Sequence, residues 1–210
     1  SIGSILLIIA LGLSIIYGSM GVINMAHGEF IMLGAYGAWA MNEFFGVGLL
    51  PSLAVIFIGV AILGALVERG IIRHLYRRTL DTILATWGIG VMLQQAVRLS
   101  AGGELRYVEM PPSMAGTINI FGVDVSAYRV FIILMGGGLF LATWYIFNKT
   151  TIGMKLRAVV QDRSIATAFG IDAGRVYTLT FAYGAGLAGL AGALVSPLKS
   201  VSPEMGTGYV

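Results

Sequence analysis

Three polar side chains lie within six residues of an otherwise apolar N-terminal stretch. Asn24, His27 and Glu29 belong to the segment Asn-Met-Ala-His-Gly-Glu-Phe, and two of them can ionise. Ionisable groups at membrane depth are costly, and they usually face the inside of a helix bundle or a water-filled cavity. The segment therefore predicts either a polar clamp that holds a helix broken at Gly28 or a direct part of a solute path.

The same side chains were considered as a metal site or as an acid–base pair. His27 and Glu29 are two residues apart, which on a helix places them on nearly opposite sides. A metal ion would need a further ligand, and the only other histidine, His74, lies in a basic segment. An intramembrane enzyme would need a nucleophile paired with a base, and the sequence offers no such spacing. We therefore predict no metal, no cofactor and no catalytic residue.

A second polar group lies in the stretch 82–97. Thr86 and Gln94 are eight residues apart, about two helical turns, so a helix would place them on one face. Glutamine offers both a donor and an acceptor, which a neutral amide solute would require. Gln94 and the adjacent Gln95 could bind a partner helix or line a solute path, and the sequence leaves both interpretations open.

A third group predicts a short amphipathic helix. Asp162 can cap its start, and Gly170 can end it in the left-handed conformation. The apolar residues with helical spacing are Ile165, Ala168 and Phe169. Such a helix lies on the bilayer surface or docks into a partner. None of the three lysines follows a glycine, as a phosphate-binding loop would require, so ATP-driven transport would need a separate ATPase polypeptide.

The composition indicates which kind of protein positions these groups. Of 210 residues, 57% are hydrophobic and 11% are charged, whereas soluble domains carry about 25% charged residues. Mean hydropathy is +0.88. So few charges could not cover a soluble globule, and a disordered chain needs low hydrophobicity and high net charge. The chain is predicted to be an all-α, polytopic helical membrane protein. It contains no cysteine, which excludes disulfides and thiolate sites within it.

Charge-free stretches locate the membrane segments, because a spanning helix needs about 20 mainly apolar residues. Residues 1–42 hold one long segment and one shorter segment. The other four segments are 44–67, 82–97, 130–148 and 176–198, the second of them extended by a turn. We therefore predict about six membrane segments. Glycine and alanine crowd the stretch 182–193, which predicts close helix packing there.

The basic residues predict the orientation. Nine of the 13 lysines and arginines lie within 68–78 and 149–176, so both segments are predicted to be cytoplasmic. The loop 99–126 carries one arginine against three acidic residues and is predicted to be extracytoplasmic, with a short β-rich or irregular flap. The net charge of +3 then reflects membrane topology. No basic patch comes with interleaved exposed aromatic residues, so the partner is the lipid bilayer and not nucleic acid.

Several motifs resemble the branched-chain amino-acid-type permease family of bacterial ABC importers. They are Gly-Val-Ile-Asn-Met-Ala-His-Gly-Glu at 21–29, Leu-Ala-Thr-Trp-Gly at 84–88 with the two glutamines, Arg-Ala-Val-Val-Gln-Asp at 157–162, and Ser-Pro-Glu-Met-Gly at 202–206. The first motif is specific for the wider family, whereas the second and the last favour its urea-transporter branch. The resemblance covers essentially the whole chain, which would form a single permease domain over 1–210. Because the chain starts at Ser1 without methionine, we expect both of its ends to be the edges of a fragment.

This resemblance implies a permease subunit of the bacterial inner membrane. Its solute would be urea or a short-chain amide; the alternatives are a branched-chain amino-acid permease of the same family and a self-contained urea or amide channel. The implied partners are a second related permease subunit, two cytoplasmic ABC ATPases and an extracytoplasmic solute-binding protein. A coupling helix is implied within 149–176, where only two residues keep the spacing of the importers' Glu-Ala-Ala motif. Its contact residues would be Gln161, Asp162, Arg163, Ala166, Phe169 and Gly170.

Overall fold

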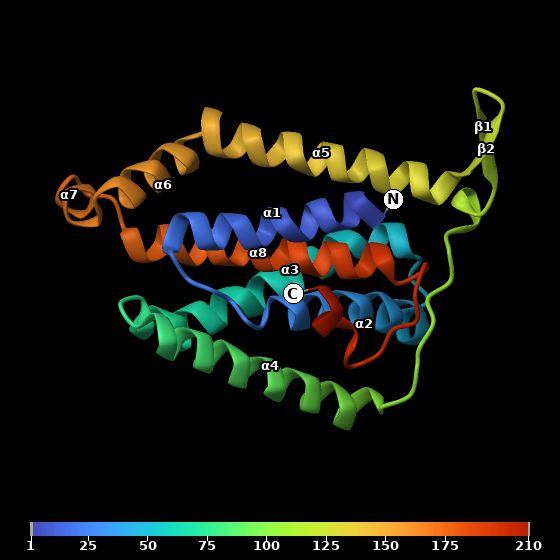
Figure 1. Cartoon of the computed structure of the whole chain (residues 1–210), viewed down its shortest axis with the longest axis horizontal. Coiled ribbons are helices and arrows are strands. Elements are labelled where there is room, and N and C mark those ends of the chain that lie inside the picture. The colour runs from blue at the N-terminus through green and yellow to red at the C-terminus, as the bar shows by residue number, and fades with distance from the viewer. Residues whose placement is uncertain (1, 210) are drawn as a thin grey trace.

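The computed structural model describes residues 2–209, in which six long helices lie side by side (Figure 1). These helices are α1 (Ile2–Met20), α2 (His27–Phe45), α3 (Leu49–Gly70), α4 (Thr79–Ala101), α5 (Ala127–Lys149) and α8 (Ala173–Val195). By length and composition α1, α3, α5 and α8 are able to cross a membrane. The helices α2 and α4 are less apolar because they carry the polar groups singled out above. The predicted polytopic helical fold is confirmed, with four of the six predicted segments meeting the criteria for a span.

The two basic segments lie at one end of the bundle. This end holds η1 (Ile72–Leu75), α6 (Thr151–Gln161) and α7 (Arg163–Ala168), at the left in Figure 1. The opposite end holds η2 (Pro112–Met114) and an antiparallel hairpin of β1 (Thr117–Ile120) and β2 (Val123–Ser126). The predicted flap is therefore a β-hairpin. This separation is what the predicted orientation requires, with one end cytoplasmic and the other extracytoplasmic.

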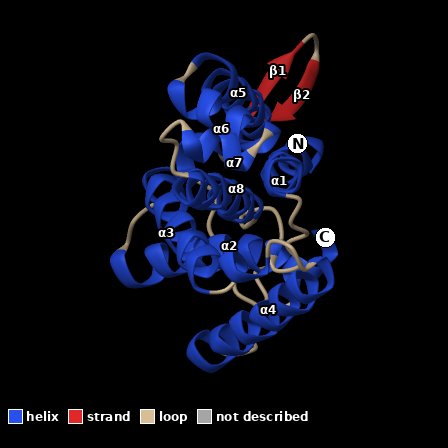
Figure 2. Cartoon of the chain, turned by 90° about the vertical axis from the view of Figure 1, so that its left-hand side faces the viewer, coloured by secondary structure: helices blue, strands red, loops and turns tan. Residues whose placement is uncertain are grey.

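Helix α8 forms the centre of the bundle. Viewed along the helices, it lies among α1, α2 and α3 (Figure 2). In its most apolar stretch 83% of the residues are buried, against 28% or less in the other three spans. A side chain on Gly184 would collide with Gly12 and Ile16 of α1, and one on Gly192 would collide with the Ile31 carbonyl of α2. Glycine lets backbones approach closely where lipid provides no hydrophobic driving force. The close packing predicted from 182–193 is thus confirmed.

The helical structure is interrupted between α1 and α2, where the chain turns back into the bundle. Helix α1 ends at Met20, and Gly21 follows in the left-handed conformation with a φ of 65°. Residues 21–26 are irregular, and α2 begins at His27. The prediction of a break at Gly28 is wrong, because Gly28 lies in the first turn of α2. The left-handed residue that ends the first helix is Gly21 instead.

A second segment folds back after α8. Residues 196–204 return from the end of α8, and η3 (Met205–Tyr209) packs against the start of α2 (Figure 1). Gly206 lies so close to Gly28 that a Cβ atom would overlap the Gly28 carbonyl oxygen. An Arg98–Glu204 ion pair and a backbone bridge between Arg106 and Val201 hold this returning segment. The two inward turns therefore meet each other.

Candidate functional site

The irregular connection between α1 and α2 is held by Asn24 and Thr86. Asn24 is buried; its Oδ1 accepts a hydrogen bond from the Ala26 backbone nitrogen at 3.0 Å, and its carbonyl accepts one from His27 at 3.3 Å. The backbone nitrogen of Met25 donates to Thr86 Oγ1 of α4 at 3.1 Å. Buried backbone groups need such partners wherever a helix is interrupted. Asn24 and Thr86 therefore support the break from behind, as the predicted clamp requires.

His27 and Glu29 point to opposite sides of α2, as their spacing predicted. The Nε2 atom of His27 lies 3.1 Å from the Ile9 carbonyl oxygen of α1, and because a carbonyl only accepts, Nε2 carries the proton. Glu29 faces α4, where its Oε1 accepts a hydrogen bond from Gln94 Nε2 at 2.7 Å. His27 thus joins two helices, whereas Glu29 and Gln94 contact each other directly and both border a gap.

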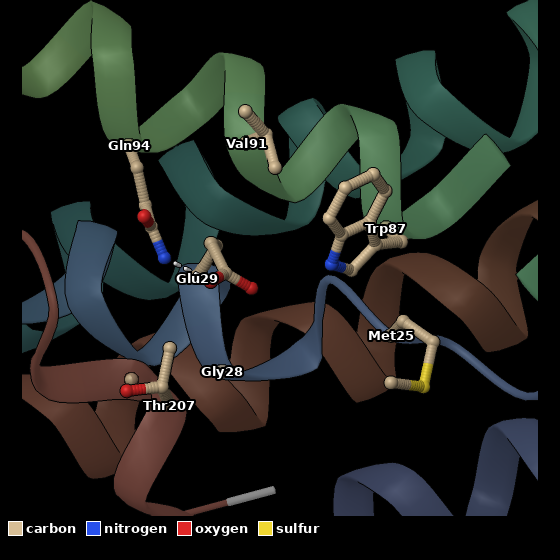
Figure 3. Close-up of a pocket in the computed structure, with 8 residues that line it drawn as sticks. Met25, Gly28, Glu29, Trp87, Val91, Gln94 and Thr207 are labelled. Carbon is tan, nitrogen blue, oxygen red and sulfur yellow. Dashed lines mark hydrogen bonds between the residues drawn. The ribbon is translucent and has the colours of Figure 1, made fainter. Parts of the chain in front are cut away.

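This gap is a pocket of about 360 Å³ at the edge of the bundle. Three elements surround it: the start of α2 with the break before it, one face of α4, and η3 (Figure 3). Its lining residues are Met25, Gly28, Glu29, Trp87, Val91, Gln94, Gly206 and Thr207. A carboxylate and an amide therefore lie side by side next to an indole and aliphatic groups. Such a lining suits a small solute with a polar head and an apolar body.

The sequence of this chain matches one permease family from end to end. The profile of the family described as "Branched-chain amino acid transport system / permease component" covers residues 1–210. The chain belongs to this family. Its relatives include the high-affinity branched-chain amino acid permease protein LivH of Escherichia coli, 29% identical over 98% of this chain and 71% of LivH. BraD of Pseudomonas aeruginosa, which bears the same description, is 28% identical over 93% of this chain and 67% of BraD. LivM of E. coli is 25% identical over 95% of this chain and 52% of LivM. No solved structure gives a significant match.

This membership establishes the general role of the chain. The permease is a transport subunit and not an enzyme, and it is a multi-pass protein of the inner (plasma) membrane. The urea branch, which two short motifs favoured, finds no support in the family description or in the relatives' names. Both name branched-chain amino acids, the alternative substrate considered from the sequence.

The pocket contains only part of the site predicted for this permease. Glu29 and Gln94 line it, Asn24 and Thr86 support it from behind, and His27 faces away toward α1. Gln95 does not line the pocket, because it lies about 100° further round α4 than Gln94 and is exposed there. Of the two glutamines, therefore, only Gln94 contacts α2 at the pocket.

At the end of the permease that carries α6 and α7, the predicted caps of the short helix are confirmed. Asp162 Oδ1 accepts a hydrogen bond from the Ile165 backbone nitrogen at 3.0 Å. Gly170 has a φ of 89°, and its nitrogen donates to the Thr167 carbonyl at 3.0 Å. The apolar side chain of Phe169 remains 82% exposed, so this part of the helix is available to a partner.

Two of the predicted contact residues also make contacts within the chain. Ala166 is buried in an apolar cluster with residues of α6 and α8. The guanidinium carbon of Arg163 lies 5.3 Å from the centre of the Tyr177 ring. Four of the predicted contact residues line a shallow groove on the surface of this loop: Gln161, Asp162, Ala166 and Phe169. The contacts of these residues with an ATPase remain a prediction.

Sequence reasoning missed the contribution of η3 and one buried carboxylate. Thr207 completes the pocket, and no local motif near it indicates a return into the membrane. Glu68 is fully buried at the end of α3. Its one signal in the sequence is its position as the first charge after the apolar stretch 44–67.

Proposed function

We propose that this chain is a permease subunit of an ATP-driven ABC importer, and that it forms part of the path for branched-chain amino acids. The observation that carries the proposal is the pairing of Glu29 and Gln94 beside apolar side chains in one pocket. Membership of a family described by branched-chain amino acid transport supports the same solute class.

The pocket offers a complementary group to each part of an amino acid. The Glu29 carboxylate would take the ammonium group through a charge-assisted hydrogen bond. Gln94 Nε2 carries two hydrogens, and only one of them is needed for Glu29, so the other can donate to the solute carboxylate. Trp87, Val91 and Met25 would cover the aliphatic side chain, whose burial is favourable in proportion to its apolar area.

The position of the pocket supports a paired permease. Helix α4 lies at the edge of the bundle (Figure 2), and its Trp87 is 61% exposed although it lines the pocket. A second, related permease subunit packed on this side would complete the wall. The similarity of this chain to both LivH and LivM of E. coli, each a permease protein of a branched-chain amino acid system, supports such a pair.

The remaining partners follow from what transport requires. Two ATPase subunits would dock on the loop 149–176, where the exposed side chain of Phe169 is presented, and an extracytoplasmic protein would deliver the solute. Closure of the ATPases would move the helices as rigid bodies and alternate access to the pocket.

The solute is tested by reconstituting the full-length permease with its partner subunits in proteoliposomes. We expect leucine and valine to be taken up only when ATP and the binding protein are present. Uptake of radiolabelled urea without leucine would replace the proposed solute by an amide. Urea flux without ATP would replace the importer by a self-contained channel.

Coupling is tested by the Gly170→Pro substitution. Proline fixes φ at about −65° and has no backbone N–H, so neither the φ of 89° nor the bond to Thr167 can be kept. We expect ATP hydrolysis to continue while solute uptake falls at least about tenfold, measured together in proteoliposomes. The matched control is Gly170→Asn, because asparagine tolerates the left-handed conformation and keeps its N–H. Equal uptake in the two variants would contradict the role of this helix end.

A further inference from the structure

Glu68 is a buried carboxylate that the pocket does not use. It lies at the end of α3 with 0% exposure, and its Oε2 accepts a hydrogen bond from Thr178 Oγ1 of α8 at 2.5 Å. Its Oε1 accepts a hydrogen bond from the hydroxyl of Tyr76, in the connection between α3 and α4. Arg73 Nη2 lies 3.8 Å from Oε2. Glu68 therefore links the end of α3 both to the connection that follows it and to α8, 110 positions further along the chain.

The surrounding groups are arranged to keep this carboxylate in place. Arg73 Nη2 also donates to Thr178 Oγ1 at 3.0 Å and to the Gly174 carbonyl at 3.2 Å, so it joins the same connection to α8 independently. Burial, followed by the hydrogen bond to Glu68, raises the pKa of Tyr76 above its ordinary value. The phenol consequently keeps its proton and remains a donor. Removing one partner from such a buried set leaves a polar group unsatisfied, which is costly.

The hydrogen-bonded groups around Glu68 are connected to the coupling helix α7 through two aromatic rings. Arg163 is the first residue of α7, and its guanidinium carbon lies 5.8 Å from the Tyr76 ring centre and 5.3 Å from that of Tyr177. The two tyrosine rings contact each other edge to face, with centroids 5.2 Å apart. Cation–π contacts of this kind contribute about 0.5–1 kcal/mol at exposed sites and more when desolvated. A continuous path thus runs from α7 through the two rings to Glu68.

Both helices that Glu68 holds, α3 and α8, are connected to the pocket by packing contacts. Helix α3 packs along α8, where Gly189 contacts Val60 and Gly64 contacts Ala185. Helix α8 in turn lies against α2 through Gly192, and α2 begins at the pocket. Through the apolar cluster around Ala166, a displacement of α7 would move α8 but not α3. The polar path adds α3, so both helices would move as one body.

We infer that Glu68 is a positioning residue for energy coupling: by holding Tyr76 and Thr178, it makes α3 and α8 follow the coupling helix α7 together. This inference rests on the proposed function, since coupling presumes an ATP-driven importer. A purely structural role for Glu68 would instead change the amount of folded and assembled permease, and would lower hydrolysis and transport in proportion.

The first test measures solute molecules moved per ATP hydrolysed, using the complete complex in proteoliposomes. Glu68→Gln keeps the size of the side chain, but it offers amide hydrogens where two hydroxyls already donate and removes the charge beside Arg73. We expect its transport per ATP to fall at least about tenfold, with ATP hydrolysis within about twofold of the parent. Thr178→Val, which loses the hydroxyl, should fall in the same way, whereas Thr178→Ser should retain the parent ratio. Arg69→Gln, an exposed neighbour of Glu68, is the matched control.

The second test needs no transport. Because residues 1–210 contain no cysteine, spin labels can be placed on Phe169→Cys, directly after α7, and on Leu80→Cys of α4. Both positions are exposed, and the distance between them reports the position of the coupling helix. We expect one narrow distance distribution in the labelled permease and a broadened or shifted one when Glu68→Gln is added. An unchanged distribution, or an unchanged ratio of solute to ATP, would overturn the inference. Absence of ATP-dependent uptake in the parent would overturn the proposed function instead, while the distance measurement would still decide the role of Glu68 in holding α7.

Discussion

The Gly192→Ala variant is expected to lose about 3 kcal/mol of free energy of unfolding, the upper end of the usual cost of overpacking, or to fail to fold. A Cβ atom at this position would overlap the carbonyl group of Ile31 and approach the backbone nitrogen of Ala35. Both obstacles are backbone atoms of α2, so no side-chain rotation can relieve them. Moving the helices apart would also break the neighbouring contact between Gly34 and Gly189.

Helix propensity acts in the opposite direction but is too small to decide the outcome. Alanine in a helix interior is favoured over glycine by about 1 kcal/mol. The control is Gly138→Ala in α5, where a Cβ atom would meet nothing within 4 Å. Thermal unfolding of the two purified variants in detergent separates the effects: Gly138→Ala should melt at or above the parent temperature, and Gly192→Ala well below it. Equal melting temperatures would mean that α2 and α8 are not in backbone contact.

The helices and the caps could be predicted because their causes are local. Uncharged apolar stretches of sufficient length predicted the six long helices, four of which meet the criteria for a span. The crowding of small residues in 182–193 predicted the close packing of α8. Asp162 and Gly170 cap a helix through bonds to residues three positions away, so a short sequence window contains the whole interaction. The orientation remains a prediction from the basic residues, and the structure places both basic segments at one end of the bundle.

The site itself depends on contacts between residues that are far apart in the sequence, so no short sequence window contains both partners. Glu29 and Gln94 are 65 positions apart, and Thr178 and Glu68 are 110 apart. In a membrane helix the lipid-facing and core-facing sides are both apolar, so the sequence does not tell which side of α4 faces inward. For this reason Gln95 was grouped with Gln94 although it is exposed. The break was placed at Gly28, but the left-handed residue is Gly21. Gly28 lies in the first turn of α2, where Gly206 of η3 packs against its carbonyl group.

The Glu29→Gln variant is expected to lose about 10- to 100-fold of leucine uptake while folding and hydrolysing ATP normally. Glutamine keeps the shape of the side chain, and its amide oxygen can still accept from Gln94, so the pocket should be retained. What is lost is the negative charge opposite the solute ammonium. A hydrogen bond to a charged group contributes about 1.5–3 kcal/mol, which corresponds to roughly 10- to 100-fold in affinity.

The matched control is Glu43→Gln, which removes the same charge from the far end of α2, where Glu43 is exposed. Both variants are compared by the concentration dependence of uptake in proteoliposomes, with binding protein and ATPases unchanged. Loss of leucine uptake in both variants would assign the effect to net charge and not to the pocket. Full uptake by Glu29→Gln would remove Glu29 from the solute path.

The same variant distinguishes the two solute classes by their charge. Urea is neutral and would use Glu29 only as a hydrogen-bond acceptor, a function that the glutamine oxygen retains. A neutral hydrogen bond contributes about 0.5–1.5 kcal/mol, so urea uptake should fall by less than about tenfold even if that bond were weakened. For an amino acid, the substitution removes the only negative charge in the pocket that faces the ammonium group. The polar side chains of Gln94 and Thr207, which also line the pocket, are uncharged. A large loss with leucine and a small loss with urea therefore means that the pocket recognises its solute through the ammonium group.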